Sequence, residues 1–328
     1  MFSEQQYKAP VWGRNKHIQS LLATAKFRRP LVEKRAQPLL QSSEEVILEC
    51  GDGVRLLGYY SPQEHTAAPL VILLHGWEGS ADSMYLLSSA QKLFAAGFSV
   101  FRLNLRDHGD SHHLNEDLFH SCRLDEVIGA VKYIQQRYPA EQTFMAGYSL
   151  GGNFSLRVAA NAHLHGISLN KVVAICPPID PHDTMVQLEQ GFTLYNWYFL
   201  VKWHRSLKKK AQLFPHKYNG DDLIRIKDLA KLTEVLLAEF GEFESVRHYF
   251  DAYALKGEML SDLQTPAVML LAKDDPIIRH QGSDLVQASQ HLTIVKTEHG
   301  GHCGFLKNAK LHSWADDFLL QEFARPAT

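Results

Sequence analysis

The nine residues from Phe144 to Gly152 restrict the fold of this chain more than any other part of its sequence. They read FMAGYSLGG, so Gly147 and Gly151 stand on either side of Ser149, between an apolar segment and an amphipathic one. A strand turns directly into a helix only where side chains are almost absent, and glycine provides that freedom. The pattern therefore predicts a tight strand–turn–helix unit, with Ser149 in a strained backbone conformation and its hydroxyl exposed as a nucleophile requires.

Short apolar runs alternate with amphipathic segments along most of the chain. Strands are predicted at 46–49, 55–61, 70–74, 98–105, 143–146, 171–175, 267–271 and 292–295, and helices at 84–96, 124–137, 150–162, 281–289 and 311–323. This alternation requires crossover connections and predicts an α/β fold with a mostly parallel, doubly wound sheet. Only the turn at 51–53 separates the first two strands, so they are expected to form an antiparallel edge.

The alternation of predicted strands and helices stops after Pro177 and Pro178. Residues 181–262 are predicted to be helical and are rich in aromatic residues and lysine. An insertion at this point lies above the carboxyl ends of the strands, where open α/β sheets place their ligand sites. We therefore expect a helical cap at 181–262 inserted into a core of 44–180 and 263–328, with an irregular arm at 1–43 packed on that core.

Charge and cysteine content exclude several classes of protein. The 34 Lys and Arg residues nearly balance the 36 Asp and Glu residues, which argues against nucleic acid as a partner. The four cysteines form no C-x-x-C pair, so a reducing, cytoplasmic location is expected. No signal peptide and no membrane helix are predicted, because long apolar windows are missing. The basic arm leaves a weak peripheral membrane contact among the expected partners, and a monomer or small homo-oligomer is expected.

A serine hydroxyl acts as a nucleophile only beside a base, which needs an orienting acid. In a fold of this kind the acid and then the base follow the serine along the chain. The loop after the last predicted strand reads EHGGHCGF and offers His299 and His302. We favour His302 because Gly301 and Gly304 leave room for its ring to reach Ser149, whereas His299 is expected at the surface.

The candidate acids lie in a loop at the carboxyl end of the preceding predicted strand. This loop reads LAKDDP and contains Asp274 and Asp275. Asp180 and Asp183, which follow the strand at 171–175, are alternatives.

The oxyanion of a tetrahedral intermediate needs two backbone N–H donors. One is expected from Leu150, directly after the nucleophile. The other is expected from Trp77, in the loop HGWEG that follows the strand at 70–74. His75 in the same loop is expected to brace it by hydrogen bonds.

Together these residues resemble the α/β-hydrolase superfamily, and within it the YheT-like abhydrolase branch. The matching pieces are NKHIQS at 15–20, His75-Gly76 with Gly79, NLRDHG at 104–109, GYSLGG at 147–152, YFDAY at 249–253, DDP at 274–276 and GHCGF at 301–305. Members often have Arg-Gly where this chain has RDHG at 106–109. Because that loop borders the site, the shape of the pocket is expected to differ.

The resemblance implies a carboxylic ester hydrolase that uses Ser149, Asp275 and His302. It favours Asp275 over Asp274 because the family places its acid at the third residue after Ala272. Family members hydrolyse short- or medium-chain acyl esters, and some act on acylglycerols or phospholipids. The expected partner is therefore a small-molecule acyl ester, and no cofactor is needed. A thioesterase or an alcohol acyltransferase would use the same residues and stays an alternative.

One cluster of polar residues raises the alternative of a metal-dependent hydrolase. Its members are Asp107, His108, Asp110, His112, His113 and His120. Zinc needs three or four converging ligands, and no H-E-x-x-H motif is present. We expect a polar loop braced by His108 and predict no metal.

The segment 194–210 is aromatic in its first half and basic in its second. It is expected either to pack as cap helices on the core or to line an acyl pocket. Trp197, Phe199 and Tyr148 are the candidate substrate-binding residues.

Overall fold

The computed structural model describes residues 7–65, 67–287 and 289–325, which form one eight-stranded sheet. In chain order the strands are β1 (Glu44–Glu49), β2 (Arg55–Ser61), β3 (Leu70–Leu74), β4 (Ser99–Leu103), β5 (Thr143–Tyr148), β6 (Lys171–Ile175), β7 (Ala267–Ala272) and β8 (Leu292–Thr297). Their order across the sheet is β1-β2-β4-β3-β5-β6-β7-β8. β2 pairs antiparallel with β1 and β4, and the other pairs are parallel. The predicted α/β class and antiparallel edge are confirmed.

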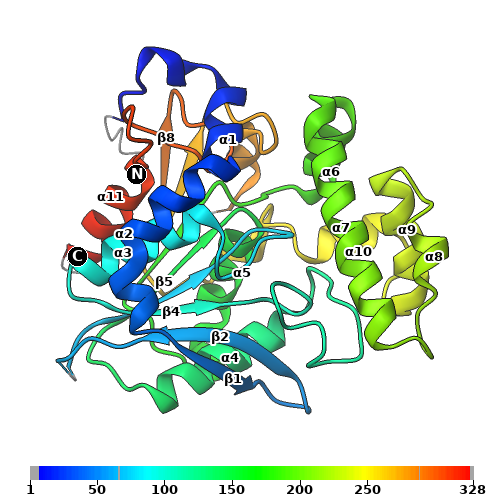
Figure 1. The fold of residues 1–328 in the computed structure, drawn as a ribbon, viewed down its shortest axis with the longest axis horizontal. Coiled ribbons are helices and arrows are strands. Elements are labelled where there is room, and N and C mark those ends of the chain that lie inside the picture. The colour runs from blue at the N-terminus through cyan, green and yellow to red at the C-terminus, as the bar shows by residue number, and fades with distance from the viewer. Residues whose placement is uncertain (1–6, 66, 288, 326–328) are drawn as a thin grey trace.

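Helices cover both faces of the sheet, and a further group lies to one side of it (Figure 1). The helices are α1 (Lys16–Thr24), α2 (Arg29–Gln41), α3 (Met84–Ala95), α4 (Leu124–Arg137), α5 (Leu150–Asn161), α6 (Pro181–Gln190), α7 (Thr193–Leu213), α8 (Gly220–Leu223), α9 (Leu229–Phe240), α10 (Val246–Ala252) and α11 (Trp314–Ala324). α4 and α5 pack on one face, and α2, α3 and α11 on the other, each with its own apolar core. α6 to α10 all lie between β6 and β7 in the chain.

Two segments differ from the sequence-based expectation. The arm is not irregular, because Asn15 caps α1 by accepting hydrogen bonds from two backbone N–H groups, and Pro30 lies in the first turn of α2. The prediction of a helix at 281–289 is wrong. The segment instead forms a short 3-10 helix, His280–Leu285, which ends where Val286 pairs with Gly257 in an isolated β-bridge. This distant partner draws the backbone into an extended conformation.

Candidate active site

The structure brings three of the predicted site residues into one hydrogen-bonded chain. His302 Nε2 lies 3.0 Å from Ser149 Oγ, and His302 Nδ1 lies 2.9 Å from Asp275 Oδ2. Ser149 stands between β5 and α5, Asp275 follows β7 and His302 follows β8, all at the carboxyl ends of parallel strands. The arrangement is that of a nucleophile, its base and an orienting acid.

The turn around Ser149 has the backbone that the glycine pattern predicts. Ser149 has φ 51° and ψ −122°, in the positive-φ region that side chains rarely occupy. A Cβ on Gly147 would lie 2.1 Å from the carbonyl oxygen of Gly151, and one on Gly151 would lie 2.4 Å from that of His75. Only glycine fits at both positions, so the turn holds Ser149 rigidly at the start of α5.

Asp275 is held by more hydrogen bonds than the one to His302. Its Oδ1 accepts hydrogen bonds from the backbone N–H groups of Ile277, at 2.8 Å, and Ile278, at 2.9 Å. Its side chain is only 1% exposed. The carboxylate is therefore oriented before any substrate binds, with Oδ2 directed at His302.

The other acids and the second histidine have structural partners elsewhere. Asp274 accepts a hydrogen bond from the backbone of Gly301 and lies 3.3 Å from His299 Nδ1. Asp180 caps α6, and Asp183 forms an ion pair with Arg279. None of these four polar side chains is hydrogen-bonded to Ser149 or His302 in the described residues, so the geometry favours Asp275 and His302 as the acid and base.

Opposing influences set the charge of His302. Burial lowers its pKa, but the Asp275 carboxylate raises it, with a further contribution from Cys303, and the net result is a pKa well above the ordinary value. Burial raises the pKa of the Cys303 thiol, whereas Cys176 and His302 beside it lower it to about 6. The neighbouring carboxylate thus stabilises the charged imidazole that would form when a neutral His302 accepts a proton from Ser149.

The two predicted oxyanion donors flank Ser149. Leu150 is the first residue of α5, so its N–H has no acceptor within the helix. Trp77 follows Gly76, whose backbone approaches so closely that an added Cβ would lie 3.0 Å from Ser149 Cβ. The loop after β3 is thus packed directly against the nucleophile.

Two histidines hold this loop in place, as predicted. His75 Nε2 accepts a hydrogen bond from the N–H of Leu105, and His108 Nε2 accepts one from the N–H of Glu78. Both rings are buried, and burial is the main reason why their pKa values are lowered. The pKa of His108 is lowered to about 4. Neutral rings act here as hydrogen-bond acceptors that lock the loops after β3 and β4 together.

An apolar pocket with an empty volume of about 850 Å³, part of it open to solvent, adjoins Ser149 and His302. Its other lining residues are Trp77, Phe119, His120, Ser121, Leu150, Pro178, Pro181, Thr184, Met185, Leu188, Phe199, Trp203, Thr233, Leu236, Tyr249, Phe250, Tyr253 and Ile277. Most come from α6 to α10. The Trp77 ring stacks on that of Phe199, with centroids 5.2 Å apart and planes 10° apart. Phe199, one of the three candidate substrate-binding residues, therefore lines this pocket.

The other two candidate substrate-binding residues lie outside the pocket. Trp197 is 60% exposed, because two residues along a helix correspond to a rotation of about 200° and place it opposite Phe199. Tyr148 is the last residue of β5, and its side chain points away from the side of the sheet that Ser149 faces. Its hydroxyl lies 2.6 Å from Ser89 Oγ, in the core under α3 and α11.

Helix α1 contributes residues that the sequence reasoning did not assign to the site. Ser20 Oγ accepts a hydrogen bond from the backbone N–H of His302 at 2.8 Å. Gln19 is fully buried and bonds both the N–H and the carbonyl of Leu306. The only sequence signal was the family match at 15–20, which carries no indication of what the segment contacts.

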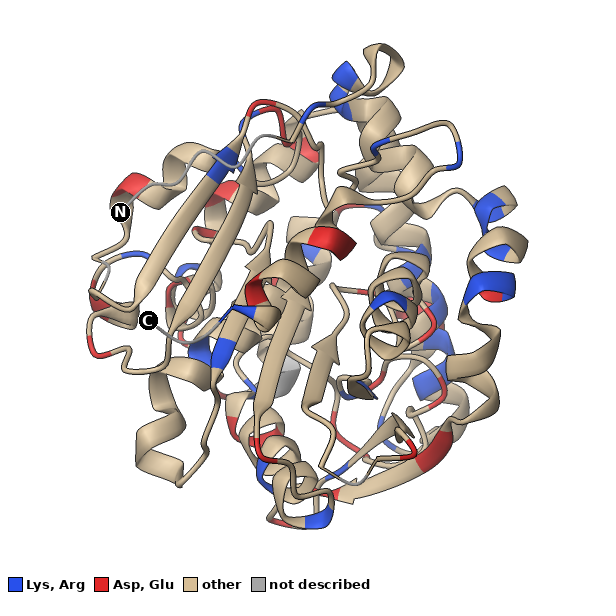
Figure 2. Ribbon diagram, turned by 90° about the vertical axis from the view of Figure 1, so that its left-hand side faces the viewer, with Lys and Arg blue, Asp and Glu red and all other residues tan. Residues whose placement is uncertain are grey.

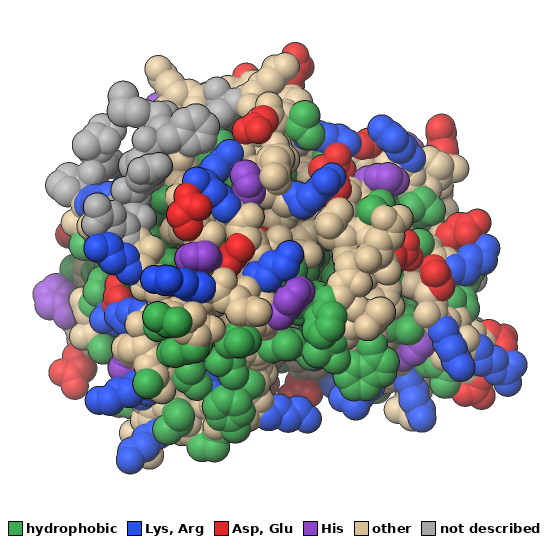
Figure 3. Space-filling model, turned by 90° about the horizontal axis from the view of Figure 1, so that it is seen from above, with side chains coloured by type: hydrophobic (Ala, Val, Ile, Leu, Met, Phe, Trp, Pro, Cys, Tyr) green, Lys and Arg blue, Asp and Glu red, His purple; other side chains and the backbone are tan. Residues whose placement is uncertain are grey.

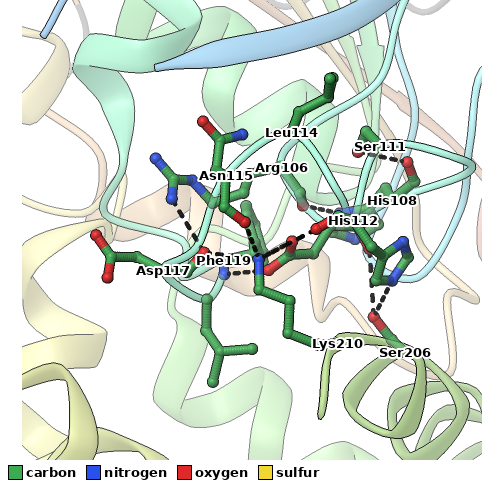
Figure 4. A network of polar contacts seen from close by, with 12 residues as sticks. Arg106, His108, Ser111, His112, Leu114, Asn115, Asp117, Phe119, Ser206 and Lys210 are labelled. Carbon is green, nitrogen blue, oxygen red and sulfur yellow. Dashed lines mark hydrogen bonds and ion pairs between the residues drawn. The ribbon is translucent and has the colours of Figure 1, made fainter. Parts of the chain in front are cut away.

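The polar loop after β4 is tied to α7 by hydrogen bonds (Figure 4). Lys210 enters the loop and donates to Asp107 Oδ1 at 2.7 Å and to the carbonyls of Asn115 and Asp117. His112 Nε2 lies 2.8 Å from Ser206 Oγ, also on α7. The ammonium group thus occupies the place that a cation would take in this loop.

The one group of potential metal ligands that lie close together in the described residues is Cys176, His302 and Cys303. Both ring nitrogens of His302 are hydrogen-bonded, to Asp275 and to Ser149. A metal ion could take this histidine as a ligand only by breaking the hydrogen-bonded chain.

This fold and site are those of an α/β hydrolase. A family model described as alpha/beta hydrolase fold matches residues 69–309, and the chain belongs to that family. Within the family it is similar to the Escherichia coli K12 protein named "Putative esterase YheT", with 26% identity over 320 residues that cover 95% of this chain and 90% of that protein. The predicted YheT-like resemblance is confirmed.

Other relatives are more distant. Mouse phospholipase ABHD3 is 21% identical over 92% of this chain and 73% of its own length. Human monoacylglycerol lipase ABHD2 is 22% identical over 60% of this chain and 51% of its own length. Among solved structures, the Pyrococcus furiosus esterase Pf2001 superposes with a TM-score of 0.55 at 14% identity, over 87% of this chain and 92% of that one. A bacterial membrane phospholipase A superposes with a TM-score of 0.56 at 14% identity, over 93% of this chain and 91% of that one. These structures share the fold.

Proposed function

We propose that this α/β hydrolase of the esterase and lipase type cleaves carboxylic esters with Ser149 as nucleophile, His302 as general base and acid, and Asp275 as the orienting acid. The observation that carries the proposal is the continuous hydrogen-bonded chain from Asp275 through His302 to Ser149 at the wall of an apolar pocket. Relatives named as esterases and lipases support the same reaction type.

The reaction follows from the positions of these groups. His302 Nε2 removes the proton from Ser149 Oγ as this oxygen attacks the ester carbonyl, and the N–H groups of Trp77 and Leu150 bind the developing oxyanion. His302 then protonates the departing alcohol. Water, deprotonated by the same ring, attacks the acyl-enzyme and releases the carboxylic acid. Throughout, Asp275 fixes the tautomer of His302 and stabilises its charged form.

The pocket indicates which part of the substrate it binds. Its lining is mainly aromatic and aliphatic, so it favours the acyl chain of the ester over a charged or sugar-like group. We assign residues 181–262 as a cap that supplies most of this lining, inserted into a core of 44–180 and 263–328, with residues 1–43 as an arm on the core. A small acyl ester of short or medium chain length is the proposed substrate, and no cofactor takes part.

The test is hydrolysis of a p-nitrophenyl ester series from acetate to decanoate. Ser149→Ala is expected to lower kcat/KM by on the order of 10⁴-fold or more, because covalent catalysis is lost. Wild type should prefer an intermediate chain length, and a fluorophosphonate probe should label Ser149 and no other serine. Ser155→Ala, six residues after Ser149 on α5, serves as the control. Full activity of Ser149→Ala would overturn the proposal.

A further inference from the structure

Large apolar side chains are exposed at the end of the molecule where the arm meets α6 and α7. We call the group formed by Val11, Ile18, Phe192, Leu194 and Trp197 the rim patch. Val11 is 79% exposed, Trp197 60% and Phe192 46%. Figure 3 views this end of the molecule and shows hydrophobic side chains gathered with Lys and Arg among and around them.

The two halves of the rim patch are in contact. His17 on α1 lies 3.0 Å through Nδ1 from Tyr195 Oη on α7, and its ring centroid lies 4.9 Å from that of Phe192. Ile18 follows His17 on α1, and Leu194 and Trp197 lie three residues apart on one face of α7. The exposed residues therefore form one surface across the junction of arm and cap.

The two chain segments that carry the rim patch are basic. Residues 7–32 contain six Lys and Arg and no Asp or Glu, and residues 190–220 likewise contain six and none. Figure 2 shows how Lys and Arg are spread over the ribbon. Six of these basic side chains are exposed and form no ion pair within the described residues: Lys8, Arg14, Lys16, Lys26, Arg205 and Lys208. The surface thus combines apolar side chains with unpaired positive charge.

We propose that the rim patch docks on a bilayer that contains anionic phospholipid. Aromatic and aliphatic side chains enter the boundary between headgroups and acyl chains, while neighbouring Lys and Arg remain at the charged headgroups. A second copy of this chain is a poorer partner, because pairing two rim patches would bring positive charges together. No helix in the described residues could cross a membrane, so the contact would be peripheral.

The rim patch borders the proposed active site. Ser20, two residues after Ile18 on α1, is hydrogen-bonded to the backbone of His302. Tyr195 lies between Leu194 and Trp197, and the Asp275 carboxylate raises its pKa in addition to the larger effect of burial. A docked molecule would thus hold its reactive end near the lipid. The inference extends the proposed function to esters dissolved in a membrane, but vesicle binding can be measured without turnover.

The test is co-sedimentation of the full chain with vesicles of ether-linked lipids, which the proposed activity cannot hydrolyse. Vesicles of phosphatidylcholine alone are compared with vesicles in which half is replaced by phosphatidylglycerol. We expect binding to the anionic vesicles, at least tenfold weaker binding to the neutral ones, and a decline with added salt. Phe192→Ser with Trp197→Ser should weaken binding at least tenfold, and Lys16→Gln about fivefold.

Leu164→Ser is the matched control. Leu164 is 68% exposed but lies in the 3-10 helix Ala162–His165 after α5, which runs away from the carboxyl edge of the sheet. This variant should bind vesicles like wild type, and every variant should hydrolyse a soluble p-nitrophenyl ester at the wild-type rate, which separates this inference from the proposed function. Equal binding to neutral and anionic vesicles, unchanged binding of the Phe192/Trp197 variant, or dimers that this variant abolishes would overturn the proposal.

Discussion

At the scale of single residues, the position of His302 depends on a helix far away in the sequence. Its loop has positive φ at Gly301, Cys303 and Phe305, between 47° and 59°. For residues other than glycine such a conformation costs about 1–3 kcal/mol and persists only where the surroundings hold it. Ser20 and Gln19 on α1 provide that hold through their hydrogen bonds to this loop. We infer that Ser20 positions the base.

Ser20→Ala tests this positioning role. Loss of the hydrogen bond to the His302 N–H should lower kcat for a p-nitrophenyl ester about tenfold with KM little changed, because the ring orientation suffers but the pocket does not. Ser20→Thr keeps the hydroxyl and should restore most of kcat. Thr24→Ala, at the exposed end of the same helix, is the control. A Ser20→Ala variant that is less stable but has the wild-type kcat would reduce Ser20 to a structural residue.

Local sequence pattern singled out Ser149 and His302, because each lies in a turn or loop that follows a buried strand, and these strands end at one edge of the sheet. For the acid it left Asp274 and Asp275 open, and only the family resemblance favoured Asp275. The sequence pattern failed where the direction of a side chain decides whether a residue lines the pocket. Tyr148 is adjacent to Ser149 in the chain, yet it faces the opposite core. Trp197 and Phe199 share a helix but not a face of it. Such directions depend on register and rotation, which the composition of a segment does not specify.

At the scale of elements, buried strands were predictable and helices held by distant partners were not. The strand Leu70–Leu74 is fully buried, and its bounds are those of an uninterrupted apolar run. In α1 the polar residues Gln19 and Ser20 are buried and face the loop of His302, whereas the apolar Ile18 is exposed. A helix that packs through its polar residues contradicts the rule that the apolar face is the buried one, so its contacts could not be predicted from its pattern.

A buried ion pair is among the contacts that join α7 to the core. The side chains of Lys210 and Asp107 are 1% and 4% exposed, with 2.7 Å between Nζ and Oδ1. Burial lowers the pKa of Lys210 and raises that of Asp107, and each partner opposes the effect on the other. Lys210 and Asp107 each therefore need the other in order to remain charged inside the protein.

Lys210→Met should lower the free energy of unfolding by about 3–5 kcal/mol, because it leaves the Asp107 carboxylate buried without its partner. Adding Asp107→Asn should recover part of this loss, since the remaining group is then neutral. Lys209→Met removes an exposed ion pair with Asp110 and should change stability by less than ~1 kcal/mol. Urea unfolding of the four proteins measures these differences. A loss for Lys210→Met no larger than for Lys209→Met would show that the buried pair does not hold α7.

At the scale of the whole molecule, the two faces of the sheet differ in what packs against them. The face with α4 and α5 leads to the pocket, whereas the opposite face contains a buried polar cluster that joins three elements. Asp316 on α11 accepts hydrogen bonds from Ser88 and Ser89 on α3, and Ser89 also contacts the hydroxyl of Tyr148 at the end of β5. The cluster links β5, which ends next to Ser149, to the two helices behind it.

This cluster makes stability depend on pH. Burial raises the pKa of Asp316 from the usual 3.8 to about 6, although the serine hydroxyls lower it in part. The folded chain therefore holds this proton more tightly than the unfolded chain does. As pH rises from about 3 to about 7, the free energy of unfolding should fall through this group by about 3 kcal/mol in all, and about 2 kcal/mol of this fall lies between pH 4 and pH 6.

Asp316→Asn removes this titration while retaining a group that can bond to the serines. The stability of the variant relative to wild type should therefore increase by about 2 kcal/mol between pH 4 and pH 6 and level off above about pH 7 at a total of about 3 kcal/mol, as measured by urea unfolding at each half unit of pH. Asp317→Asn is the matched control with the opposite sign. Its pKa is lowered, because Lys307 and Lys92 outweigh the larger single effect of burial, so its contribution is lost as pH falls. Parallel curves for wild type and Asp316→Asn would mean that the carboxyl titrates alike in both states, and that the polar cluster does not make stability depend on pH.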